Sequence, residues 1–224
     1  REAATNNAKR PAGYRIGTLG GVVSSPAMRS EELGALAGDL APVDLGPIHN
    51  RARDEVVRKG KATGKEHGVA VLGDGTMVSF GGDYENRIEI PRCDAPEGSV
   101  TIHHNHPSGD SFSRADLRVL LERSEIGRVD AHGHHGGWSS IKRIGGPVSP
   151  TSALILVEEA MSQAQSMTRK ATIRNTISAE AGQSGLWQVV MSLLLEGQGV
   201  IHYALNSDSV LDSRFAHFEG CFPG

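Results

Sequence analysis

Histidines gather in one short stretch, His103–Asp110, which reads His-His-Asn-His-Pro-Ser-Gly-Asp. The residues leading into it have strand character, and at the end of a strand residues i and i+2 point to the same side, about 6.5 Å apart. His104 and His106 can therefore both bring a ring nitrogen to one metal ion, at roughly 2.0–2.1 Å for zinc. His103 points to the opposite side, where we expect a core or supporting role.

A third ligand is available shortly downstream. Pro107 turns the chain after the strand, and Asp116 falls in the first turn of the helix expected over Ser113–Arg123. Two histidines and one carboxylate would leave the fourth position of a zinc tetrahedron to water, the arrangement of catalytic rather than structural zinc sites. The sequence therefore predicts Zn²⁺ bound by His104, His106 and Asp116.

The pattern resembles the motif of the JAMM (MPN/JAB-like) zinc metalloproteases. That motif combines His-x-His-Pro with Ser-x-x-Asp and a glutamate well upstream, and residues 104–110 are especially similar in wording to RadC-type and bacterial phage- or toxin-associated JAMM-like domains. The resemblance covers about Pro47 to Ile144. Six residues lie between His106 and Ser113, one fewer than is usual in the family.

The resemblance implies a catalytic role for two further residues. Glu66, which stands 38 positions before His104, would be the general base on the activated water, and Ser113 would hydrogen-bond the developing oxyanion. Bound zinc lowers the pKa of water to about 7 and polarises the scissile carbonyl. The first interpretation is thus zinc-dependent hydrolysis of a peptide or isopeptide bond in a protein or peptide substrate. Three carboxylates compete with Glu66 for the role of base: Glu85, Glu89 and Asp110.

Two other functions stay open. The same histidines suit a His-metal nuclease of the HNH (ββα) type, but 23 Lys+Arg against 26 Asp+Glu give a net charge of −3, whereas proteins that neutralise phosphates are normally basic. Nucleic acid is therefore not favoured as a partner. A catalytically silent JAMM-like scaffold in a phage or toxin assembly is the non-enzymatic alternative. Ser113-x-x-Asp116 is also a capping box in type, a role that can coexist with catalysis.

Hydrophobic periodicity predicts the elements that position these residues. Helices are expected over Ser30–Leu40, from Pro47 to a stop at Gly60 and Gly64, and over Ser113–Arg123, Thr151–Lys170 and Leu186–Leu195. Strands are expected over Glu66–Leu72, Thr76–Phe80, Arg87–Ile90, Ser99–His103, Val129–His132 and Trp138–Ile144. In the third helix, Leu117, Leu120 and Leu121 share one face.

This order predicts an α/β (α+β) fold, with a mixed central β-sheet flanked by helices. The resemblance implies a JAMM/MPN-like (cytidine-deaminase-like) core with a helical C-terminal tail. We divide the chain into an N-terminal arm (1–45), a metal-dependent hydrolase domain (46–146) and a helical C-terminal extension (147–224). The extension carries no readable motif, and an oligomer or larger assembly through its helices is left open.

Composition excludes several classes of protein. Two cysteines, Cys93 and Cys221, rule out a disulfide scaffold and a Cys-rich zinc module. The chain has no apolar run near the ~18 residues of a membrane span. The N-terminus lacks the apolar core of a signal peptide. We therefore expect a cytoplasmic protein that has no membrane partner.

Two further clusters are interpreted as solvated surface. His132, His134 and His135 stand among glycines without an acidic partner at clear ligand spacing, which favours a solvated hairpin turn over a second metal site. A basic run is interrupted by acidic residues and is expected to be a solvated helix face; it comprises Arg51, Arg53, Arg58, Lys59, Lys61 and Lys65.

Overall fold

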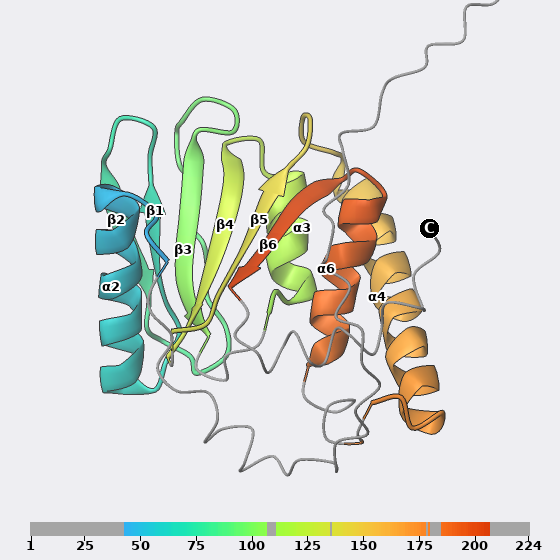
Figure 1. The fold of residues 1–224 in the computed structure, drawn as a ribbon. Coiled ribbons are helices and arrows are strands. Elements are labelled where there is room, and N and C mark those ends of the chain that lie inside the picture. The colour runs from blue at the N-terminus through green and yellow to red at the C-terminus, as the bar shows by residue number, and fades with distance from the viewer. Residues whose placement is uncertain (1–42, 107–110, 135, 178, 180–184, 207–224) are drawn as a thin grey trace, which may run out of the picture.

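A computed structural model describes residues 43–106, 111–134, 136–177, 179 and 185–206 (Figure 1). The helices are α2 (Pro47–Thr63), α3 (Arg114–Glu122), α4 (Pro150–Ile173) and α6 (Leu186–Gly197). The strands are β1 (His67–Val71), β2 (Met77–Gly81), β3 (Val100–His106), β4 (Ile126–Gly133), β5 (Trp138–Arg143) and β6 (Ile201–Asn206). The predicted helix Ser30–Leu40 lies outside the described residues.

The six strands form one mixed sheet in the order β2-β1-β3-β4-β5-β6. Strands β3 and β4 are parallel, and the other neighbouring pairs are antiparallel. Parallel neighbours need a crossover connection, which α3 provides here. The predicted mixed α/β architecture is therefore confirmed.

Helices cover the two faces of the sheet unequally (Figure 1). On one face, Ala52 and Val56 of α2 pack against Val69 and Val71 of β1. The larger cluster occupies the opposite face, where α3, α4 and α6 lie (Figure 1); it includes Ala70, Ile102, Leu117, Leu120, Leu121, Val157 and Val190. The predicted buried face of the third helix is confirmed, because all three of its leucines are at most 1% exposed.

Helix α2 begins and ends as its sequence predicts. Pro47 stands in the first turn, where its missing N–H costs no hydrogen bond. Gly64 closes the helix in the left-handed conformation (φ 70°), and its N–H donates to the carbonyl of Gly60. Gly60 itself remains inside the helix and is buried against the sheet.

The C-terminal region is not wholly helical, contrary to the prediction. Residues 201–206 form β6, which pairs with β5 at the end of the sheet. Buried residues of α4 and α6 join the same core as the central strands. No helix among the described residues combines the length and the apolar character needed to cross a membrane.

The strand predicted over Arg87–Ile90 is also wrong. These residues are irregular, and the Ile88 side chain lies over Gly68 and Gly81, where added Cβ atoms would clash with it. The carbonyl of Ile90 accepts a hydrogen bond from the Arg123 guanidinium rather than from a strand. The alternation of exposed and half-buried side chains in this segment thus comes from packing against the sheet and not from strand pairing.

Replacing Leu121 by Ala should lower the free energy of unfolding by roughly 2–5 kcal/mol, because a cavity would replace a core side chain. Urea unfolding of both proteins measures the loss. The control is Leu154→Ala on α4, where the side chain is 41% exposed and a change within about 0.5 kcal/mol is expected. Equal losses in the two variants would contradict the assigned core.

Candidate metal centre

The carboxyl end of β3 and the first turn of α3 bring three donor side chains together. His104 and His106 alternate with His103 and Asn105 along β3 and therefore share one face of the sheet. Helix α3 crosses that same face, and its N-cap is Ser113, so Asp116 lies in its first turn. The predicted helix start is confirmed, and it places the carboxylate above the two histidines.

The three donors lie close enough to share one ion. The Nε2 atoms of His104 and His106 are 2.8 Å apart. The carboxylate of Asp116 lies 3.5 Å from His104 Nε2 and 3.8 Å from His106 Nε2. Tetrahedral ligands at roughly 2.0–2.1 Å from zinc would be about 3.3 Å apart. The donor set therefore fits zinc in type and spacing, and the structure brings together all three predicted ligands.

The charge states in this cluster suit ligands. Burial lowers the pKa of His104 to about 4, although Asp116 opposes the shift, so the imidazole is neutral near pH 7. Burial alone would raise the pKa of Asp116, but His104, His106 and hydrogen bonds from Ser113 outweigh it and lower the pKa. A neutral imidazole and an ionised carboxylate are the forms that bind a metal.

Ser113 and Asp116 form the expected capping box. The Ser113 hydroxyl and backbone N–H donate to Asp116 Oδ2 at 2.7 and 2.8 Å, and the Asp116 N–H donates back to the hydroxyl at 3.3 Å. The single hydroxyl proton of Ser113 is thus directed at Asp116 in this arrangement. In this arrangement the hydroxyl orients the carboxylate.

Glu66 lies on the same face as the donors, across from His106. Strands β1 and β3 pair antiparallel with Gly68 opposite His104, and the same register continued by two residues puts Glu66 opposite His106. Burial raises the pKa of Glu66 to about 7, while His106 lowers it and Asp116 raises it further. Residues 67–105 therefore bring Glu66 back beside the end of β3 that carries the two histidines. Glu66 stays outside the three-donor group itself.

Asn105 fixes the backbone on both sides of Glu66. It is fully buried, its Oδ1 accepts from the His67 N–H at 2.8 Å, and its Nδ2 donates to the Lys65 carbonyl at 3.1 Å. A Cβ on Gly60 would come within 2.6 Å of the Asn105 side chain, so the helix approaches Asn105 closely only because that position is glycine. The sequence analysis missed this residue, although its place between the two ligand histidines was a signal.

Tyr203 was also missed, because strand β6 was not predicted. Its hydroxyl lies 3.0 Å from the hydroxyl of Ser111. Its ring makes an edge-to-face contact with Phe112, and Phe112 makes a second such contact with His104. Tyr203 thereby holds the residues that precede α3. The period-two alternation of Ile201–Leu205 was the available signal.

A second buried polar cluster lies on the opposite face of the sheet. His103 Nε2 is 2.9 Å from His49 Nδ1, and His103 Nδ1 is 3.0 Å from His132 Nε2. The prediction that His103 points away from the metal donors is confirmed, and its side chain is fully buried. The prediction of a solvated turn is wrong for His132, which is 1% exposed in β4. His134 is half-buried against Asn105, and His135 lies outside the described residues.

Comparison with models of known families, with curated proteins and with solved structures finds no match to this chain.

The imidazole NMR signals of His103 and His132 should stay unchanged between pH 8 and 5. Burial lowers the pKa of His103 to about 3 and holds that of His132 well below its usual value. Protonation then favours the unfolded chain, so the stability that these residues contribute is complete above about pH 6.5 and is lost as pH falls toward 3. Added N-acetylhistidine serves as the titrating reference. Midpoints near 6.5 would contradict the buried, neutral cluster.

Proposed function

We propose that this chain is a zinc-dependent hydrolase of peptide or isopeptide bonds that works as JAMM-like enzymes do. The observation that carries the proposal is the convergence of His104, His106 and Asp116, with a half-buried Glu66 opposite one of them. Three protein ligands leave a position for water, as in catalytic zinc sites. The site also lies at the carboxyl end of a parallel strand, where α/β proteins commonly bind ligands.

Zinc in this site would polarise the scissile carbonyl and activate the attacking water. Glu66 would accept a proton from the attacking water and return it to the leaving amine. Its pKa near 7 suits both transfers at neutral pH, because a base is most effective when its pKa lies close to the working pH. Asp116 remains ionised through its contacts with the histidines and with Ser113.

Ser113 has two proposed contributions. The observed hydrogen bonds make it the residue that orients Asp116. Donation to an oxyanion, the role implied by the resemblance, requires the hydroxyl proton to turn away from that carboxylate. The backbone N–H of Ser113 would then still hold Asp116, so the two contributions are compatible.

The nuclease alternative is less well supported. An HNH-type site places its ligands on a hairpin followed by a helix, whereas here the histidines end a strand whose crossover leads into a parallel neighbour. A metal-binding scaffold without activity is the other outcome that the experiments below can distinguish.

His106→Ala should abolish stoichiometric zinc while leaving the far-ultraviolet circular dichroism unchanged, because the sheet and its core, rather than the ion, hold the fold. Elemental analysis of protein purified with zinc measures the loss. His202→Ala, at an exposed position on β6, is the matched control and should retain one zinc per chain. Full zinc occupancy in the first variant would refute the ligand assignment.

Glu66→Gln should keep zinc and lose about 10²–10⁴-fold in turnover, because the amide retains size and polarity but cannot accept the proton. A library of quenched fluorescent peptides and isopeptides provides the assay. The control is Glu89→Gln, a competing carboxylate that is exposed, and it should keep full activity. Zinc-loaded wild-type protein that cleaves nothing would support the scaffold, and magnesium-dependent nicking of DNA would support the nuclease.

A further inference from the structure

A cavity of about 740 Å³ lies between α2 and the β4–β5 hairpin, on the sheet face opposite the three metal donors. Its volume is in the usual range for a small-molecule site. Its apolar lining comes from Val43, Leu45, Val57 and the ring of Trp138. The cavity shares no lining residue with the metal centre.

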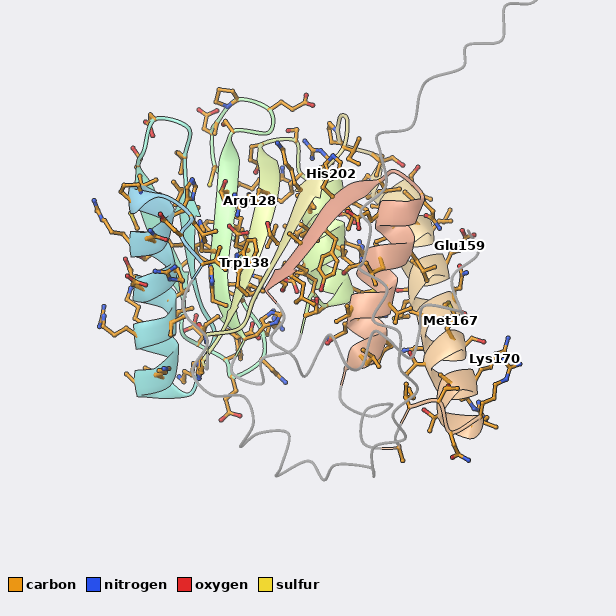
Figure 2. All side chains as sticks on the ribbon, viewed as in Figure 1. Arg128, Trp138, Glu159, Met167, Lys170 and His202 are labelled. Carbon is orange, nitrogen blue, oxygen red and sulfur yellow. The ribbon has the colours of Figure 1, made fainter. Side chains whose placement is uncertain are left out.

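Two residues that line this cavity each carry a buried nitrogen atom that has no hydrogen-bond partner among the described residues: His132 Nδ1 and Trp138 Nε1. The two residues are direct cross-strand partners of β4 and β5, so their side chains stand together on one face (Figure 2 labels Trp138). Leaving a buried polar atom unpaired is costly, and native proteins seldom leave two at one place without a water or a ligand.

Both atoms are donors. The indole nitrogen always carries its hydrogen. The carboxylate of Asp130, paired with Arg128 at 2.9 Å, lies 3.5 Å from His103 Nδ1 and favours a hydrogen there. That N–H would then donate to His132 Nε2, which leaves the hydrogen of neutral His132 on Nδ1. A ligand that satisfies both donors must present acceptor atoms.

The charges around the cavity favour an anion. Arg53, Arg58, Lys61 and the acidic Asp54 line it. Arg53 pairs with Asp54 at 2.9 Å, so Arg58 and Lys61, three residues apart on α2, supply the excess positive charge. These residues belong to the basic run that the sequence analysis assigned to a solvated face.

We propose that this cavity is a second site, which binds a small organic anion: a carboxylate or phosphate group on an apolar body. The oxygens accept hydrogen bonds from His132 Nδ1 and Trp138 Nε1 and face Arg58 and Lys61. The apolar body packs against Leu45 and its neighbours. The site is independent of the proposed hydrolysis and needs no metal ion.

Calorimetric titration with phenyl phosphate and with benzoate tests the proposal, with benzyl alcohol as the neutral analogue. At least one anion should bind saturably with a dissociation constant of about 1 mM or tighter, and benzyl alcohol at least about tenfold more weakly. Arg58→Ala and Lys61→Ala should each weaken binding of the anion by about tenfold or more. Arg51→Ala, a matched exposed cation on the same helix outside the cavity, should leave it unchanged.

Trp138→Phe keeps an aromatic ring and deletes one hydrogen-bond donor, so it should also weaken binding of the anion. If that variant fails to fold, the two exposed cation variants still decide the question. Absence of saturable binding by both anions up to about 10 mM would overturn the proposal. Equal binding of benzyl alcohol, or equal effects of Arg51→Ala and Lys61→Ala, would overturn it as well.

Discussion

The buried carboxylate of Asp116 is the contact on which the rest of the site depends. It caps α3 through Ser113 and at the same time faces both histidines of β3, so one group fixes the helix to the strand that it crosses. A buried charge is expensive unless polar groups surround it. Here His104 and His106 both compensate the charge of Asp116 and would bind a cation together with it. One arrangement therefore serves both the fold and the metal-binding geometry.

Local signals predicted much of the site from the sequence. The alternation of His104 and His106, the start of a helix at Ser113 and its leucine face all depend on neighbours within a few residues. Their positions are confirmed because strand and helix periods leave little freedom over such short distances. The pairing of β1 with β3, which brings Glu66 opposite His106, has no local signal; only the resemblance implied that Glu66 belongs to the site.

What the sequence analysis missed depends on distant contacts. Asn105 gains its importance from backbone groups 38 and 40 residues away, and His132 is buried in a central strand against His103, 29 residues away. The irregular stretch that ends at Pro91 alternates like a strand, but the carbonyls of Ile90 and Pro91 accept hydrogen bonds from Arg123, 33 and 32 residues downstream. The wrong prediction for residues 201–206 had a different cause. This alternating segment follows two helices, and it was assigned to the same helical extension as they were.

The central place of β3 has a consequence for how the molecule opens. Residues 101–104 of β3 are paired on both sides, to β1 and to β4, and helices cover both faces, whereas β2 and β6 each have one neighbour among the described strands. Amides in such a strand exchange with solvent only in the largest unfolding events, and those of edge strands exchange by local fraying. His104 therefore stands on the last segment to open, and an ion could leave and return without the chain coming apart.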